Sequence, residues 1–162
     1  MGLFLSTVIN KVDSKGRVSV PANFRAALKQ EEFQGVILFP GNTDQHEFLE
    51  GCGMEFLERL SAGLETLPTF SEEQETINHF VFAAAAQLPY DQTGRIMLPR
   101  EMMEATGITT QAAFVGLGKT FQVWEPETYQ QHITALRARS KGRRPTAPAL
   151  AEAARPAPKG AS

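Results

Sequence analysis

The sequence predicts a β-rich α+β fold that is built from one duplicated unit. The segment Asp13–Pro21 recurs 78 residues later as Asp91–Pro99, with Asp, Gly, Arg and Pro at the same spacing and two aliphatic positions matched by type. Both copies lead into a short helical stretch, two apolar strands and a further helix. Because the order of predicted elements repeats together with the motif, we interpret the chain as a tandem duplication.

A strand and a helix are predicted directly after each copy of the turn. Two aliphatic residues in each copy alternate with residues on the other side of the chain, which is the period of a half-buried strand: Val18, Val20, Ile96 and Leu98. A proline then stands where a helix can begin, because the first helical position needs no N–H. We expect these helices over Ala22–Gln30 and Arg100–Thr106.

Apolar runs bounded by glycine predict the remaining strands. In the first half they are expected over Val36–Phe39 and Phe48–Leu49. In the second half they are expected over Ala113–Leu117 and Phe121–Trp124.

Three longer helices are predicted from the spacing of apolar residues. Leucines on one face predict a helix between the halves: Leu57, Leu60, Leu64 and Leu67. Ser71 and Gln74 cap a second helix there, whose apolar face is formed by Ile77, Phe80, Val81 and Ala84. The last helix starts at Pro126, and its inward residues are expected to be Tyr129, Ile133 and Leu136.

A change in composition near residue 137 divides the chain. We expect the first half with its following helix over 3–68 and the second half with its preceding helix over 69–139. Residues 140–162 form a basic tail rich in Pro and Ala, which has too few large apolar residues to form a core and is expected to be disordered. Residues 137–162 carry seven basic residues and one acid (+6), whereas residues 1–136 carry nine basic and seventeen acidic residues (−8).

Composition excludes several classes of protein. Apolar residues make up 42% of the chain and charged residues 21%, as in a globular domain. The single cysteine, Cys52, excludes an internal disulfide framework. The longest apolar run, Phe80–Ala86, is too short to span a membrane, and no signal peptide is expected. We therefore expect a soluble intracellular protein.

The repeated turn is the strongest candidate site. Asp13 and Asp91 occupy the first position of a type I turn, and Gly16 and Gly94 occupy the fourth, where positive φ is unstrained. The turn is expected to join two strands into a hairpin and to place an arginine, Arg17 or Arg95, at the start of the second strand, pointing outward. Either guanidinium suits a guanine edge or a phosphate. Lys15 adds a charge for phosphate in the first turn, where the second turn has Thr93. A purely structural turn with a solvated arginine is the alternative.

Both motifs, at this separation and with two helices between them, resemble the MraZ family of bacterial transcriptional regulators with two SpoVT/AbrB-type half-domains. The resemblance covers about residues 3–139 and includes Gly118–Pro126. It implies a swapped-hairpin, double-split β-barrel with helices between and after the halves. It also implies a homo-oligomeric ring that binds G-rich direct repeats in double-stranded DNA upstream of its own division and cell-wall gene cluster. The DNA-binding residues of the family fall on Lys15, Arg17 and Arg95.

One segment departs from the family pattern. Gly51–Gly53 stands where these proteins usually carry a Tyr-Pro pair before the helix. This places the start of that helix in question and does not affect the DNA face.

The function expected from these observations is regulation without catalysis. We expect no cofactor, no metal site, no small-molecule substrate and no membrane partner, because no metal-ligand spacing involves His46, His79 or His132 and no nucleophile stands beside a base. The expected location is cytoplasmic and nucleoid-associated. The alternatives are an antitoxin-like protein-binding module and an oligomeric scaffold.

Overall fold

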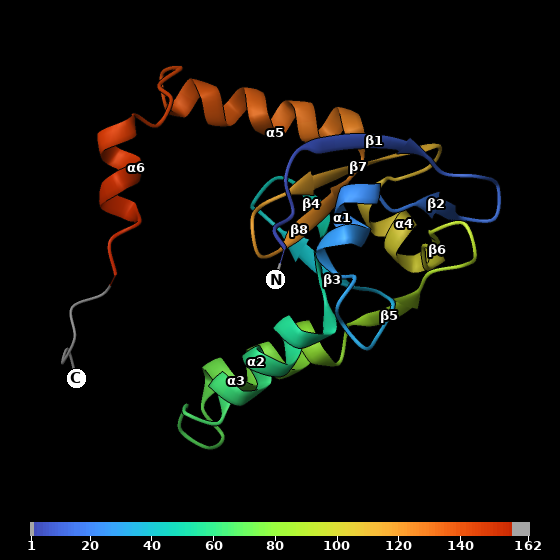
Figure 1. The fold of residues 1–162 in the computed structure, drawn as a ribbon, viewed down its shortest axis with the longest axis horizontal. Coiled ribbons are helices and arrows are strands. Elements are labelled where there is room, and N and C mark those ends of the chain that lie inside the picture. Colours follow the sequence, from blue (N-terminus) through green and yellow to red (C-terminus); the bar gives the residue numbers. More distant parts are fainter. Residues whose placement is uncertain (1, 157–162) are drawn as a thin grey trace. The chain divides into compact units, whose positions relative to one another are not determined.

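The computed structural model of this chain describes residues 2–156 (Figure 1). It contains two units, Met1–Gln130 and Gln131–Ser162, which are described separately. The first unit is α+β, as expected, and holds a six-stranded antiparallel sheet with the order β1-β7-β8-β4-β3-β5. The bounds of these strands are Thr7–Lys11 (β1), Gly35–Asn42 (β3), Glu47–Cys52 (β4), Ala86–Pro89 (β5), Gln111–Gly116 (β7) and Phe121–Trp124 (β8).

Two short strands outside this sheet form a separate antiparallel ribbon. Strand β2 (Arg17–Ser19) pairs with β6 (Arg95–Met97) from the other half. Each turn reverses the chain as expected, since Asp13 N–H donates to the carbonyl of Arg17 (2.9 Å) and Asp91 N–H donates to that of Arg95 (2.8 Å). Across the first turn, however, the two strands share only the isolated bridge between Val12 and Val18 and not a regular hairpin ladder. The strands after the two turns pair with each other because the carbonyl of each turn glycine accepts a bond from the opposite half. Leu98 N–H donates to Gly16 (2.9 Å) and Val20 N–H donates to Gly94 (3.1 Å).

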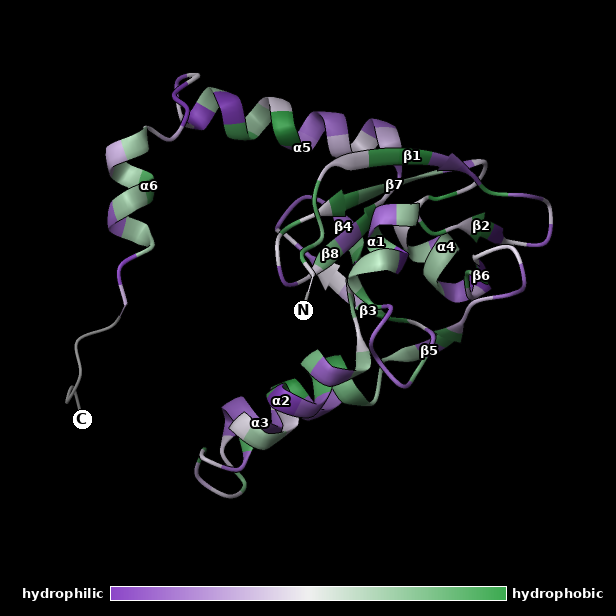
Figure 2. Ribbon diagram, viewed as in Figure 1, coloured by the Kyte–Doolittle hydropathy of each residue, from purple (hydrophilic) through white to green (hydrophobic). Residues whose placement is uncertain are grey.

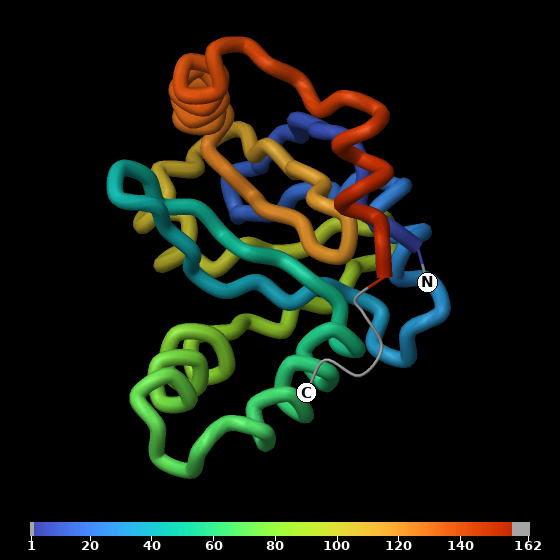
Figure 3. Tube along the Cα trace, turned by 90° about the vertical axis from the view of Figure 1, so that its left-hand side faces the viewer, coloured from blue at the N-terminus to red at the C-terminus, as the bar shows by residue number. Residues whose placement is uncertain are grey.

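The helices lie close to their predicted positions. Helix α1 (Ala22–Ala27) ends three residues before the predicted Gln30, and helix α4 spans Arg100–Thr106 as predicted. The two prolines occupy the N-cap positions and not the first helical position expected for them. Helix α2 (Met54–Leu64) is followed by α3 (Glu72–Ile77) and the π-helical turn η1 (Asn78–Phe82). In Figures 1 and 3, α2 lies beside the α3–η1 segment. As predicted, the side chain of Ser71 caps α3, and it accepts from the N–H of Gln74 at 3.2 Å.

The core combines both halves of the sequence. Four aromatic rings, Phe4, Phe24, Phe114 and Phe121, pack at its centre with neighbouring centroids 4.9 to 6.4 Å apart. Val18 and Ile96 of the β2–β6 ribbon are buried in the same cluster. Figure 2 shows hydrophobic residues along the strands and hydrophilic residues in the loops beside α1 and β2. Because the ribbon rests on the shared core, the core fixes the positions of both turns.

The helix after Ser71 differs from its prediction. Ala83 N–H donates to Asn78 five residues earlier (2.9 Å), so the chain makes a π turn. This extra residue in the turn changes the phase of the apolar face. Val81 therefore packs against the cluster around Ile37, whereas Phe80, expected to point inward, is 69% exposed.

The C-terminal part of the chain also differs from its expectation. Helix α5 spans Pro126–Arg139, with Leu136 exposed rather than inward. Helix α6 (Ala147–Ala153) lies in the segment 140–162 that was expected to be disordered. Thr146 caps this alanine-rich helix by accepting from Ala149 N–H at 3.3 Å, which favours a local helix without a core. The end of the tail, 157–162, lies outside the described residues.

Candidate nucleic-acid interface

The first turn is held together by the carboxylate of Asp13. Its Oδ1 accepts hydrogen bonds from the backbone N–H groups of Lys15 and Arg17, both at 2.9 Å. Gly16 N–H donates to the carbonyl of Asp13 at 3.0 Å, and Gly16 adopts a φ of +86°. These bonds form a β-turn that the acid begins and the glycine closes.

The second turn repeats this pattern atom for atom. Asp91 Oδ1 accepts from the backbone N–H of Thr93 at 2.9 Å and of Arg95 at 3.0 Å. Gly94 N–H donates to the carbonyl of Asp91 at 3.1 Å, and its φ is +79°. The duplication inferred from the sequence is therefore present in the hydrogen bonds themselves.

Both turn carboxylates are stabilised in their ionised form. The backbone N–H of Arg17 is the largest influence that lowers the pKa of Asp13 below its ordinary value. The backbone N–H of Arg95 is the largest influence on Asp91, whose pKa lies well below its ordinary value. Hydrogen bonds to a charged carboxylate favour its ionisation, so each turn carries a fixed negative charge beside its arginine.

Each arginine is paired with the acid of its own turn. Arg17 Nε donates to Asp13 Oδ2 at 2.7 Å, and Arg95 Nε donates to Asp91 Oδ2 at 2.9 Å. The arginines were expected to point outward, and the structure instead pairs each one with the acid of its own turn, although both side chains remain 35% exposed. The bond uses Nε, so the two Nη groups of each guanidinium remain outside the ion pair. Such half-exposed pairs contribute little to stability, but they fix the plane of the guanidinium.

The β2–β6 ribbon brings the two arginines to one face. Arg17 lies opposite Met97, and Ser19 lies opposite Arg95. Residues directly opposite each other, or two apart on one strand, share a face of an antiparallel pair. The other face carries Val18 and Ile96 into the core. Diagonal neighbours of this kind have Cα atoms about 7–8 Å apart, so two guanidinium groups from different halves occupy one small surface.

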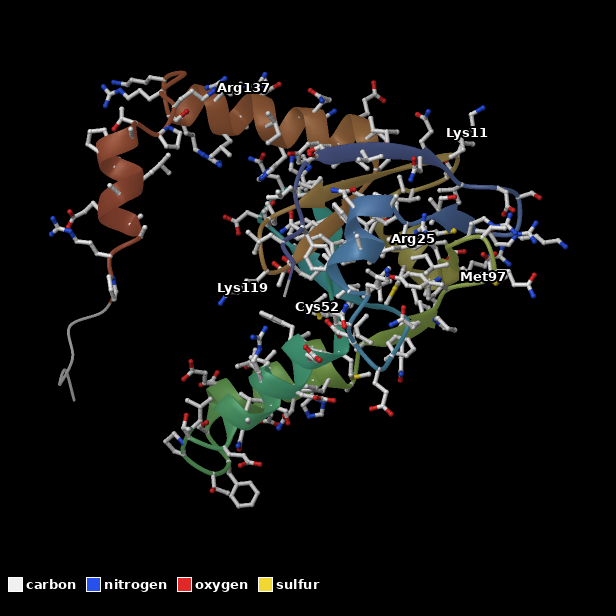
Figure 4. The ribbon with its side chains drawn as sticks, viewed as in Figure 1. Lys11, Arg25, Cys52, Met97, Lys119 and Arg137 are labelled. Carbon is white, nitrogen blue, oxygen red and sulfur yellow. The ribbon has the colours of Figure 1, made fainter. Side chains whose placement is uncertain are left out.

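The remaining predicted cation, Lys15, is exposed within the first turn. It is two residues from Arg17 and therefore borders the same end of the ribbon. Figure 4 shows charged side chains projecting from this part of the molecule, near the labelled Met97.

A third arginine beside the second turn was missed in the sequence. A Cβ on Gly94 would lie 2.7 Å from Cζ of Arg25, which projects from α1 (Figure 4). Arg25 Nε donates to the carbonyl of Val20 at 3.2 Å. The residue 78 positions later is Met103, whose Sδ lies 3.4 Å from a Cβ placed on Gly16. Each of the two residues contacts the turn of the other half, but an arginine and a methionine at the repeat offset are no sign of this in the sequence.

Gly51–Gly53, the segment that departs from the family pattern, is explained by packing. A Cβ on Gly51 would overlap the ring of Phe121. Gly53 leaves room for the carboxylate of Glu31, whose Oε1 accepts from Glu55 N–H at 3.1 Å in the first turn of α2. The helix therefore starts at Met54 with a cap supplied from another part of the chain.

A metal site and a reactive cysteine are the other kinds of site to consider in the described part of the chain. Among residues 2–156, no group of three His, Cys, Asp or Glu side chains could hold a metal ion. Burial is the main influence that raises the pKa of the Cys52 thiol to about 12, so the thiol is protonated and its sulfur is a poor nucleophile. Within the same described residues, no helix is long and apolar enough to cross a membrane.

Comparisons with known proteins identify the family. A family model described as "MraZ protein, putative antitoxin-like" matches residues 81–147. The "Transcriptional regulator MraZ" of Rickettsia canadensis (strain McKiel) is 43% identical over 135 residues, which cover 83% of this chain and 89% of the relative. The chain belongs to the MraZ family. Two further relatives named "Transcriptional regulator MraZ" support this assignment. The one from Rickettsia akari (strain Hartford) is 43% identical over 133 residues, which cover 82% of this chain and 88% of the relative. The one from Rickettsia typhi (strain ATCC VR-144 / Wilmington) is 42% identical over 134 residues, which cover 83% of this chain and 89% of the relative. MraZ proteins are transcriptional regulators and not enzymes.

Proposed function

We propose that this MraZ-family regulator binds G-rich direct repeats in double-stranded DNA through the face of the β2–β6 ribbon. Arg17 and Arg95 read base edges or anchor on phosphates, and Lys15 contacts phosphate. The observation that carries the proposal is the register that places both arginines on one face. The acids and glycines of the two turns hold this geometry: Asp13, Gly16, Asp91 and Gly94.

The dimensions of the ribbon support this role. The major groove of B-DNA is about 12 Å wide and admits a two-stranded β-ribbon. An arginine can donate two parallel bonds to O6 and N7 of guanine, which is the commonest specific contact in that groove. The ion pairs through Nε orient each guanidinium and leave its Nη groups to make those bonds. Retaining the fold alone requires the Asp and the Gly of each turn but not two guanidinium groups on one face.

The charge of the chain supports an oligomeric form of the regulator. Residues 1–136 carry a net charge of −8, so the body of one subunit repels DNA and its few turn cations give weak binding. A ring repeats this small positive face at a fixed spacing, and direct repeats in DNA engage several faces together. Such multivalent binding raises avidity by about 10²–10⁴-fold without new contacts.

The proposal also covers the architecture of the ring and the place where the protein acts. The ring is built from swapped-hairpin, double-split barrels, and the cross-pairing of β1 with β7 and of β2 with β6 supports that topology. The protein acts at the nucleoid in the cytoplasm and regulates its own gene cluster.

Binding to the DNA upstream of this protein's gene tests the proposal, with the repeats deleted one at a time. Affinity should fall steeply as repeats are removed, and equal affinity for one and several repeats would rule out the ring. Arg17→Ala and Arg95→Ala should each weaken binding by about 1–3 kcal/mol for every repeat engaged. Arg59→Ala, the same change on α2, is the matched control and should leave affinity unchanged.

The antitoxin-like alternative is less well supported by the C-terminal segment. A segment that wraps a partner protein needs several large apolar anchors. Between residues 140 and 156 the only such residue is Leu150. Co-purification of a small partner protein, together with no DNA binding, would favour that alternative.

A further inference from the structure

We propose that the basic turn at the end of α5 is a second, sequence-independent DNA-binding surface that contacts backbone phosphates. The basic turn comprises Arg137, Arg139, Lys141, Arg143 and Arg144. The inference rests on the proposed function, because it takes duplex DNA as the ligand of this regulator. It adds a surface that is distant in sequence from the two repeated turns.

The basic turn has a defined backbone shape. Lys141 (φ +55°) and Gly142 (φ +72°) adopt left-handed conformations at the end of the helix. Gly142 N–H donates to the carbonyl of Arg137 at 2.9 Å, and Lys141 N–H donates to Ala138 at 3.2 Å. These two bonds form the Schellman motif that ends a helix and turns the chain back. The cations before and after the motif are therefore gathered at one end of α5, where Arg137 is labelled in Figure 4.

Local bonds extend the turn beyond the motif. Arg143 N–H donates to the carbonyl of Ser140 at 3.1 Å, and Arg144 Nη1 donates to the carbonyl of Gly142 at 3.1 Å. All five cationic residues are exposed. A surface with this density of charge, held by backbone bonds, loses less conformational freedom on binding than a flexible tail does.

The charges of the basic turn exceed what the fold requires. One or two cations in the last turn are enough to stabilise the negative end of a helix, and Arg137 and Arg139 already occupy that place. Three further cations add mutual repulsion. The only acid between residues 137 and 156 is Glu152, and it pairs with Arg155 at 3.4 Å. Such an excess of uncompensated positive charge is stabilised by a ligand with many negative charges.

The composition of the basic turn favours duplex DNA as that ligand. The segment 137–144 contains no aromatic or large apolar residue. It therefore lacks the anchors that insert into a membrane interface and the rings that stack on single-stranded bases. Duplex DNA presents one negative charge for about every 1.7 Å of its axis, and phosphate contacts need no apolar anchor. Each contact releases a counterion, so it contributes affinity without reading sequence.

Salt-dependent binding of the full chain tests the inference. One variant replaces the five cations with Gln, and a control variant exchanges Arg for Lys and Lys for Arg at the same positions. Each is titrated on operator DNA and on a scrambled duplex between about 50 and about 200 mM salt. The Gln variant should lose up to about 4–5 units of the slope of log K against log salt per engaged chain. Its preference for the operator over the scrambled duplex should not change, and the control should keep the original slope.

An unchanged slope in the Gln variant would overturn the inference. Loss of binding to anionic phospholipid vesicles with no change in DNA binding would overturn it in favour of a membrane. Arg17→Ala and Arg95→Ala separate this inference from the proposed function, because they should remove the operator preference and keep the contribution of the basic turn to the slope. If the unmodified chain showed no preference for the operator but the Gln variant still lost salt dependence, only the proposed sequence-specific site would be refuted.

Discussion

At the scale of single residues, the two turns depend on glycines whose backbone conformation other residues avoid. Gly16 and Gly94 both have positive φ, and both are approached closely by the opposite half of the chain. Gly118 also has a positive φ (+88°), but nothing lies within 4 Å of the place where its Cβ would stand. The three positions separate the effect of backbone strain from the effect of crowding.

Gly16→Ala should destabilise the protein more than Gly118→Ala does. A left-handed alanine costs about 1–2 kcal/mol at either position. At Gly16 the new Cβ would also lie 3.1 Å from the carbonyl oxygen of Leu98, close to the bond that joins the two halves. Urea denaturation measures both free energies of unfolding. Equal losses would show that the opposite half does not restrict the turn.

Asp91→Asn should destabilise the protein at neutral pH and have a smaller effect in acid. Because the folded state lowers the pKa of Asp91 below its ordinary value of 3.8, ionised Asp91 stabilises the protein above that pH. This stabilisation is lost as the pH falls toward the lower folded pKa. Denaturation of the wild type and the variant between pH about 7 and about 3 measures the difference, which should shrink below pH about 4. A difference that stays constant with pH would contradict the assignment.

At the scale of elements, the start of α2 is stabilised by a residue that lies far from it in the sequence. The carboxylate of Glu31 accepts from the first turn of α2 across a glycine that leaves room for it. A negative group at this place also favours the positive end of the helix. Glu31 thus replaces the local cap that the sequence at residues 51–53 does not provide.

Glu31→Ala should lower the free energy of unfolding by about 1 kcal/mol, the usual loss when a helix cap is removed. Glu32→Ala is the matched control, because it removes the same charge from the neighbouring exposed position. Thermal or urea denaturation of both variants gives the comparison. Similar effects of the two changes would mean that net charge, and not the cap, is responsible.

The local residue pattern predicted individual helices and strands well, but it did not predict which strands pair with each other. Strand β8 and helix α4 have the predicted bounds, since an apolar run after a glycine and a preceding proline are local signals. The pairing of β2 with β6 was not predicted, because partner choice depends on contacts between residues far apart in the sequence. The ion pair of Arg17 with Asp13 was also missed. Its i,i+4 spacing is commonly considered in helices, and here a turn creates the same proximity.

At the scale of the whole molecule, one buried thiol reports on opening of the fold. Cys52 is 1% exposed and packs beside Ile37 and Leu57 at the junction of the sheet with α2. Burial, followed by the nearby Glu31 and Glu50 carboxylates, raises its pKa to about 12. The thiol therefore reacts only when this junction opens.

The native protein should react slowly with a thiol reagent at pH about 8, and it should react fully in urea. Ile37→Ala, which removes a neighbour of Cys52, should raise the native rate in proportion to the loss of stability. The absorbance of the coloured thiolate that a disulfide reagent releases measures the rate, and circular dichroism checks that the protein remains folded. Complete native labelling within the mixing time would contradict the burial of Cys52.

The pairing of strands between the halves has a consequence for synthesis on the ribosome. Thr7 lies opposite Val115, so β1 emerges long before its partner strand has been translated. A nascent chain that ends near residue 90 exposes the unpaired edges of β1 and β2, which are sites for association with other chains. Because contacts of such long sequence separation form late, each protein completes its fold only after the second copy of the motif has left the exit tunnel. A gene that encoded one copy alone would give a product that needs another molecule to fill its sheet.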